Sequence, residues 1–216
     1  MTPRLATQRT VAMTLTEVMV VVAILVIFAV FFLPVPSKTY RRAAERINCA
    51  SNLRQIGISY KMWAENNNGS FPMHISITNG GAMELIATGN VAACFQVMSN
   101  ALDNPRILVC PADASRRAAT SFGSDFSRQN ISYFINLDAV ETQPQSLLSG
   151  DDNLTVNAKN VQPGILTLYT NDRLAWTKER HDGGGNILLA DGSVQQASSA
   201  DLTSVARFAT NRLAIP

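Results

Sequence analysis

The sequence predicts an α+β protein in which a long N-terminal helix packs on a small antiparallel-sheet head. Three observations predict this fold: an uncharged apolar run from Val18 to Leu33, an apolar stripe at helical spacing from Cys49 to Trp63, and an Asp-Gly turn at 191–192 between two short strand-like segments. With 216 residues, of which 46% are hydrophobic and 16% charged, the chain has material for one domain with an apolar appendage. A formal net charge of +2 gives no global electrostatic reason to expect a nucleic-acid partner.

The apolar run near the N-terminus is long enough to cross a lipid bilayer. A helix over residues 13 to 33 rises about 30 Å, which is close to the hydrocarbon thickness of a membrane. We therefore expect a transmembrane helix over residues 13–34, an extension of the same helix over 35–66, and a globular head over 67–216. A cleaved secretory signal is the alternative, although Pro34–Lys38 offers only a poor signal-peptidase site.

The second part of the predicted helix carries a narrow apolar stripe. Its members recur at spacings of four and three: Cys49, Leu53, Ile56, Tyr60 and Trp63. Such a stripe is typical of core packing, so we expect it to contact the head. The Asn-rich segment that ends at Gly69, followed by Pro72, predicts where the helix stops.

Short helices and strands are expected in the head. A helix over 83–98 is interrupted at Gly89-Asn90, and a C-terminal helix over 200–209 has Ser199 as its predicted cap. That helix would bury Leu202, Val205 and Phe208. Strands are expected at 106–110, 131–137 and 165–170, and the hairpin at 186–195 should turn through a type I′ geometry at Asp191-Gly192. Segments 112–130 and 141–162 are interpreted as polar loops.

Glu17 interrupts the apolar N-terminal segment. A carboxylate at the centre of a bilayer costs about 2.5–3.5 kcal/mol, so it needs a partner or a position near the membrane surface. If the chain were cut before Met13, the new α-amine would lie at a similar depth and could pair with Glu17 of the same or a neighbouring subunit. The alternative is that Glu17 extends to the headgroups from an uncut helix.

The segment Ala12-Met13-Thr14-Leu15-Thr16-Glu17, followed by the apolar helix, resembles the N-terminal motif of type IV pilins and type II secretion pseudopilins. The resemblance implies a leader peptide of residues 1–12, cleavage by a prepilin peptidase between Ala12 and Met13, and N-methylation of Met13. It implies that Glu17 aligns subunits in a helical filament built from copies of the chain. It also implies a pilin-like head in the periplasm of a bacterium, anchored to the inner membrane or carried on a cell-surface filament, and served by a secretion or pilus machine.

Segments of the head resemble a pseudopilin-like group that is abundant in planctomycetes and verrucomicrobia. They are Cys49–Gly57, the Phe71-Pro72 pair, Cys110–Asp113, and His181 placed nine residues before Asp191-Gly192. His181, Asp191 and Gly192 form the signature of that group's C-terminal, prepilin-associated region. The resemblance runs from the leader to residue 195 and implies a structural subunit that is not an enzyme.

The loop that begins at His181 is a candidate metal site. Zinc usually needs three or four nitrogen or sulfur ligands, and His74 is the only other histidine. Because some pseudopilin heads hold calcium in a C-terminal loop, calcium is the metal that the resemblance implies, with Asp182 and Asp191 as ligands and Asp151 and Asp152 as distant candidates. The alternative is that no cofactor binds, that His181 hydrogen-bonds across the hairpin and that Asp191 shapes the turn.

The three cysteines, Cys49, Cys94 and Cys110, allow at most one internal disulfide. We predict a disulfide between Cys49 and Cys110, because it would fasten the long helix to the head. A Cys94–Cys110 disulfide is one alternative, and three reduced, buried thiols are the other.

Motifs of hydrolases and phosphate-binding loops are missing from the sequence, which therefore does not predict an enzyme. A single-span membrane-anchored binding domain that does not polymerise is the alternative function. A hydrolase of that kind could use Cys110 and His181, but the sequence alone cannot place these residues together.

Overall fold

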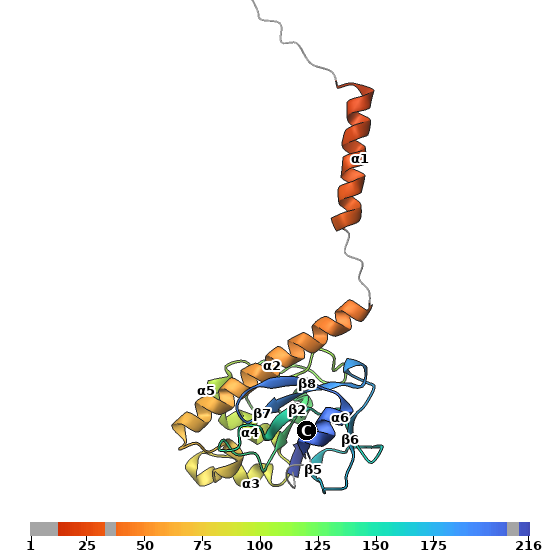
Figure 1. Ribbon diagram of the computed structural model, residues 1–216. Coiled ribbons are helices and arrows are strands. Elements are labelled where there is room, and N and C mark those ends of the chain that lie inside the picture. The colour runs from red at the N-terminus through yellow and green to blue at the C-terminus, as the bar shows by residue number, and fades with distance from the viewer. Residues whose placement is uncertain (1–12, 33–37, 207–211) are drawn as a thin grey trace, which may run out of the picture. The chain divides into compact units, whose positions relative to one another are not determined.

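The computed structural model describes residues 13–32, 38–206 and 212–216, which form two units, Met1–Lys38 and Thr39–Pro216 (Figure 1). The first unit contains helix α1 (Leu15–Phe32). Among the described residues, no helix combines the length and the apolar character needed to cross a membrane. The membrane-spanning first half of the helix therefore stays a prediction, and the leader 1–12 with Ala12, as well as the join at 33–37, lies outside the described residues.

Helix α2 (Lys38–Asn66) carries the predicted apolar stripe into the core of the head. Cys49, Leu53, Ile56 and Tyr60 are fully buried, as expected, and Trp63 is partly buried. The helix ends at the predicted stop, where Gly69 adopts a positive φ of 73° and its N–H donates to the carbonyl of Ala64 at 2.9 Å. The stripe is therefore confirmed as the surface that joins α2 to the head.

Short helices follow α2 and pack beside it. They are η1 (Pro72–His74), η2 (Ile77–Asn79), α3 (Met83–Ile86), α4 (Val91–Val97) and α5 (Ser99–Leu102). The predicted break at Gly89-Asn90 separates α3 from α4, and the Asn90 side chain caps α4 by accepting a hydrogen bond from Ala93 N at 3.3 Å. The 83–98 prediction is thus confirmed together with its interruption.

Two antiparallel sheets are present within the described residues. The larger has six strands in the order β5-β9-β1-β2-β7-β8, and the smaller has three in the order β4-β3-β6. The strands are β1 (Tyr133–Asn136), β2 (Leu147–Asp151), β3 (Leu154–Val156), β4 (Lys159–Asn160), β5 (Gly164–Thr167), β6 (Leu174–Trp176), β7 (Gly185–Leu189), β8 (Val194–Ala197) and β9 (Arg212–Ile215). The α+β class, with a helix on antiparallel sheets, is therefore confirmed.

The large sheet has apolar residues on both faces. Because side chains alternate along a strand, Tyr133 and Ile135 of β1 join the cluster that contains α2, whereas Phe134 joins a second cluster. The second cluster also contains Trp176 of β6 and Leu202 of α6 (Ser199–Ala206). The sheet is therefore the central layer of the head, covered on one face by α2 and the short helices and on the other by α6 and the small sheet (Figure 1).

Two assignments made from the sequence were wrong. Residues 106–110 do not form a strand, because Pro105 starts the 3₁₀ helix η3 (Pro105–Leu108) and the Asn104 side chain accepts a hydrogen bond from Arg106 N at 3.1 Å. The segment 141–162 is not a loop, because it contains β2, β3 and β4. Its polar residues misled the prediction, since Ser149 and Asp151 of β2 are fully buried among hydrogen-bond partners. The 112–130 segment is largely loop, and ends in η4 (Arg128–Asn130).

The C-terminal hairpin and helix differ in detail from the predictions. The β7–β8 turn lies at the expected place, but of its two central residues only Gly192 has a positive φ (86°), so the turn is not type I′. Gly192 N donates to the carbonyl of Leu189, which closes a longer loop with a left-handed glycine. Helix α6 buries Leu202, but its cap is Ser198, which accepts from Asp201 N at 3.3 Å; Phe208 lies outside the described residues.

Candidate metal centre

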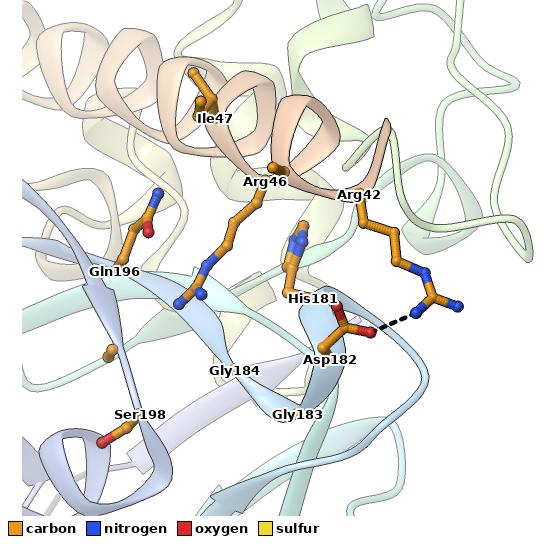
Figure 2. Close-up of a pocket in the computed structure, with 11 residues that line it drawn as sticks. Arg42, Arg46, Ile47, His181, Asp182, Gly183, Gly184, Gln196 and Ser198 are labelled. Carbon is orange, nitrogen blue, oxygen red and sulfur yellow. Dashed lines mark hydrogen bonds and ion pairs between the residues drawn. The ribbon is translucent and has the colours of Figure 1, made fainter. Parts of the chain in front are cut away.

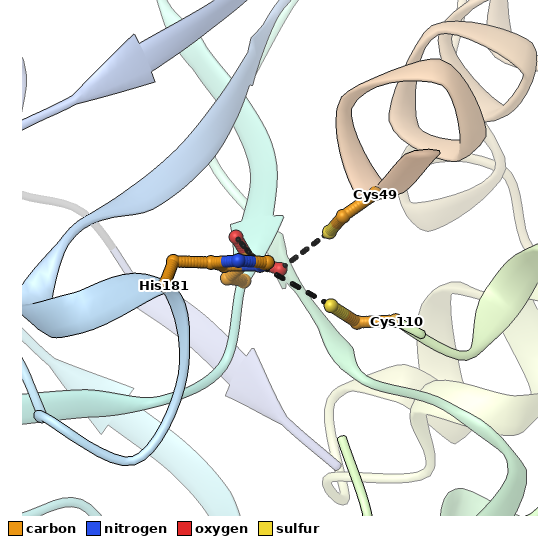
Figure 3. Close-up of side chains that lie close together, drawn as sticks. Cys49, Cys110 and His181 are labelled. Atoms are coloured by element: carbon orange, nitrogen blue, oxygen red, sulfur yellow. Dashed lines mark hydrogen bonds and ion pairs between the residues drawn. The ribbon is translucent and has the colours of Figure 1, made fainter. Parts of the chain in front are cut away.

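Four side chains from four segments meet between α2 and the large sheet. Cys49 comes from α2, Cys110 follows η3, Asp151 ends β2, and His181 begins the short helix η5 (His181–Gly183). All four are buried, and their sulfur, nitrogen and oxygen ligand atoms lie within 4.8 Å of one another. Figure 3 shows the two cysteine side chains and the imidazole pointing toward a common centre. We call this group the Cys-Cys-Asp-His cluster.

Direct contacts connect the members of the cluster. Cys49 Sγ donates to Asp151 Oδ1 at 2.9 Å, and Cys110 Sγ lies 3.2 Å from His181 Nε2. The same Nε2 lies 3.5 Å from Asp151 Oδ2. One imidazole nitrogen therefore faces both a sulfur and a carboxylate, as it would if all three pointed at one shared atom.

Neighbouring groups fix the orientation of Asp151. Its Oδ2 accepts hydrogen bonds from Asn186 N at 2.7 Å and from Asn186 Nδ2 at 3.2 Å, across the β2–β7 pair. The Tyr133 hydroxyl lies 3.3 Å from Cys49 Sγ. The Asn186 contacts hold Oδ2, which also faces His181 Nε2, and leave Oδ1 to accept the hydrogen bond from the Cys49 thiol.

A strained backbone presents His181 to the cluster. His181 and Asp182 both have positive φ angles, 52° and 55°, which place consecutive non-glycine residues in the left-handed region. Strain of this kind persists only where the surroundings fix it. The side chain of His181 is fully buried, and its Nδ1 has no hydrogen-bond partner among the described residues.

Burial and mutual contact shift the protonation of the cluster. The hydrogen bond from Cys49 lowers the pKa of Cys110 to about 6, although burial opposes this shift and His181 assists it. Burial raises the pKa of the Cys49 thiol, and the neighbouring Cys110 and Asp151 raise it further. Burial also raises the pKa of Asp151. For His181, burial lowers the pKa, but the contacts with Cys110 and Asp151 outweigh it and the net shift is upward. These shifts arise from burial and from the contacts among the four side chains.

A buried ion-pair network holds the residues next to the cluster. Arg180, which precedes His181, pairs with Asp152 and lies 3.1 Å from Asp113 Oδ2. Arg116 pairs with the same two carboxylates. Because Asp152 follows Asp151 in the chain, the network ties the end of β2 to the loop that carries His181.

Of the predicted calcium ligands, only the distant candidate Asp151 joins this cluster. Asp182 is exposed and forms an ion pair with Arg42 at 2.8 Å. Asp191 stabilises the hairpin turn, where its carboxylate accepts from Ser193 N at 2.8 Å and from Gln145 Nε2 at 3.3 Å. The signature residues are thus divided, since His181 lies in the cluster while Asp191 and Gly192 form the turn. Asp152 is occupied by the two arginines described above.

The predicted Cys49–Cys110 disulfide is not formed. All three cysteines of the chain lie in its described part and are free and buried. The structure nevertheless brings Cys49 and Cys110 together, whereas Cys94 lies elsewhere, with its sulfur 3.6 Å from the Tyr60 hydroxyl. The sequence-based search for zinc ligands missed this cluster because it assigned the cysteines to a disulfide, although two cysteines and His181 already supply three suitable donors.

A pocket of about 490 Å³ lies beside the cluster, between the first turns of α2 and the His181 loop. Figure 2 shows Arg42 reaching Asp182 at one end, while Arg46 extends past Gly184. Arg46 Nη2 donates to the Gly185 carbonyl at 3.3 Å. Because the His181 side chain is fully buried, a ligand in this pocket would face the loop backbone and the two arginines rather than the imidazole.

Comparison with known proteins found no matching family model, no similar curated protein and no similar solved structure.

Proposed function

We propose that the protein is a pilin-like structural subunit, a pseudopilin, that assembles through its N-terminal helices into a filament or pseudopilus. The observation that carries this proposal is the sequence Ala12–Glu17, which resembles a prepilin processing motif and runs into the first turn of the apolar helix α1. The machine served would be a type II secretion system or a machine similar to a type IV pilus. The head would lie in the periplasm, with α1 anchored in the bacterial inner membrane before assembly.

The surface of α1 supports this role. Large apolar side chains are exposed from Leu15 to Phe28 of the helix, including Met19 and Leu25. An apolar surface of this extent needs a dry environment. Lipid would supply it before assembly, and neighbouring α1 helices would supply it within a filament.

The position of Glu17 also supports assembly. Its Oε2 accepts hydrogen bonds from Thr14 N at 2.8 Å and from Thr14 Oγ1 at 2.9 Å, so the carboxylate turns back toward the start of α1. Cleavage before Met13 would place a new α-amine four residues before Glu17 and one residue before Thr14, whose N–H contacts this carboxylate. Pairing of the amine with Glu17 of a neighbouring subunit would neutralise both charges in a dry interface.

The N-terminus of the protein extracted from its own membranes tests the processing step. We expect intact-mass and N-terminal peptide analysis to find a chain that begins at Met13 and carries one added methyl group. Residues 1–12 still attached to the mature protein would contradict the proposal.

The assembly step has its own test. Glu17→Ala should still be processed but should fail to enter filaments, because the α-amine loses its partner. Thr16→Ala, next to it on the same helix, is the matched control and should assemble normally. Sedimentation of sheared filaments followed by immunoblotting measures both variants, and normal assembly of Glu17→Ala would refute the proposed role.

A membrane-anchored binding domain that does not polymerise is the second candidate. The pocket between α2 and the His181 loop favours it, because Arg42 and Arg46 give that pocket two cationic side chains. Such a protein would tolerate Glu17→Ala, so the same experiment distinguishes the two functions.

A further inference from the structure

We propose that Cys49, Cys110, Asp151 and His181 bind one Zn²⁺ ion, and that this ion is structural and fastens α2 to the sheet of the head. The inference does not depend on filament assembly, because every ligand lies in the unit Thr39–Pro216. An anchored binding domain would carry the same zinc site.

The donor set selects the metal. Two thiolates, one imidazole and one carboxylate are ligands that zinc accepts, and thiolate sulfur in particular favours zinc over the oxygen-binding ions calcium and magnesium. Calcium needs six to eight oxygen ligands, and the cluster offers oxygen from one carboxylate only within the described residues.

The distances between the donors are close to those around a zinc ion, since all four donor atoms lie within 4.8 Å of one another. Zinc–ligand bonds of about 2.0–2.3 Å place neighbouring donors roughly 3.3–3.8 Å apart. The contacts in the cluster are 2.9 Å for Cys49–Asp151, 3.2 Å for Cys110–His181 and 3.5 Å for His181–Asp151. Binding of the ion would move Cys49 and Asp151 apart, because their 2.9 Å contact is shorter than the spacing of two zinc ligands, and would replace the thiol proton that bridges them.

The use of one imidazole nitrogen argues against a catalytic triad. In a triad the histidine contacts the nucleophile with one ring nitrogen and the carboxylate with the other. Here Nε2 faces both Cys110 and Asp151, while Nδ1 faces neither. Side chains that bind the same ion all direct one donor atom at it, which is how Cys110, Asp151 and His181 Nε2 lie here.

Burial makes the site structural. The side chains of His181 and Asp151 have no exposed surface, and the two cysteines are buried as well, so four protein ligands would close the coordination sphere against water. Two thiolates and a carboxylate carry three negative charges, of which Zn²⁺ neutralises two. Arg46 and Arg180 act on the cluster from outside and oppose the remaining charge.

Zinc would join segments that are far apart in the chain. Cys49 and Asp151 are 102 positions apart, and Cys110 and His181 are 71 apart. A metal that binds only the folded chain stabilises it by its binding free energy. The ion would thus fulfil the role that the sequence alone assigned to a disulfide.

Metal content tests the proposal on the full chain, purified without a polyhistidine tag. We expect elemental analysis to find about one zinc per chain, and a strong chelator to remove it and lower the unfolding temperature. Replacement by Co²⁺ should give thiolate-to-cobalt charge-transfer absorption and the intense visible bands of tetrahedral cobalt. The zinc site would be overturned if the purified protein contained no zinc and showed no such absorption with Co²⁺. A Cys49–Cys110 disulfide found by non-reducing peptide mapping would overturn it as well.

The variants use the third cysteine as a matched control. Cys110→Ser and His181→Asn should reduce the zinc content to well below half of one ion per chain, whereas Cys94→Ser should retain one ion, because Cys94 is equally buried but lies outside the cluster. Equal zinc loss in Cys94→Ser would contradict the assignment. If the ligand variants do not fold, alkylation of the cysteines in the native chain tests the site instead. Removal of zinc should make Cys49 and Cys110 react with the alkylating reagent. The same labelling with and without zinc would contradict the site.

Discussion

At the scale of single residues, the centre of the large sheet tolerates almost no added volume. Gly150 lies in β2 beside Asp151, and a Cβ at this position would come within 2.8 Å of the Asn186 carbonyl oxygen and 3.0 Å of the Phe134 ring. Asn186 also holds Asp151 in place. The close approach of β2 to β7, on which the orientation of Asp151 depends, therefore requires glycine at this position.

Gly150→Ala should lower the free energy of unfolding by about 1–3 kcal/mol, because the methyl group would force the backbones of β2 and β7 apart. Urea denaturation followed by circular dichroism measures the change. The control is Gly123→Ala in an exposed loop, where the new Cβ would meet only the Ser121 hydroxyl, at 3.3 Å, and the change should stay within about 0.5 kcal/mol. Equal stability of the two variants would contradict the close-packing argument.

At this scale the sequence predicted correctly those features that depend on a few neighbouring residues. Asp191-Gly192 marked the hairpin turn correctly, because a glycine with positive φ is a property of a few neighbouring residues. The turn type was wrong because it also depends on how many residues the paired strands leave unpaired. Ser149 and Asp151 were taken for loop residues, since their composition does not reveal that partners on other strands satisfy them.

At the scale of elements, α2 contributes the fully buried side chains of Leu53, Ile56 and Tyr60 to the cluster that it shares with the large sheet. One face is buried, and its backbone approaches the β7–β8 hairpin so closely at Gly57 that a Cβ would lie 2.7 Å from Leu188 Cδ1. The opposite face exposes residues such as Ile58, which is 52% exposed. The spacing of apolar residues predicted this division, because helical periodicity sets which side chains share a face.

Leu53→Ala tests that division. We expect a loss of about 2–5 kcal/mol in the free energy of unfolding, because Leu53 is fully buried and its removal leaves a cavity. Ile58→Ala, on the exposed face of the same helix, should change it by no more than about 0.5 kcal/mol. Chemical denaturation of the two variants side by side provides the comparison, and a larger loss for Ile58→Ala would mean that the helix packs on another face.

At the scale of the whole molecule, the buried core lies entirely in the second unit as far as the described residues show. The buried hydrophobic residues of both clusters start at Cys49, whereas α1 buries none of its described side chains. We therefore expect the head to fold without α1.

A fragment that spans residues 39–216 should consequently be soluble without detergent and should unfold cooperatively, because it retains every residue of both clusters. Size-exclusion chromatography and thermal circular dichroism provide the measurement, with the full chain in detergent as the reference. Aggregation of the fragment, or a melt without a cooperative transition, would show that the first unit contributes to the folding of the head.

The sequence by itself determined the features that depend on neighbouring residues. The apolar stripe of α2, the break between α3 and α4 and the position of the C-terminal hairpin follow from helical spacing and from asparagine and glycine signals, which act over a few residues. The tertiary structure alone decided that Cys49, Cys110, Asp151 and His181 share one buried centre. These residues come from segments far apart in the chain, and only the packing of α2 on the sheet, with β2 paired to β7, brings their side chains together.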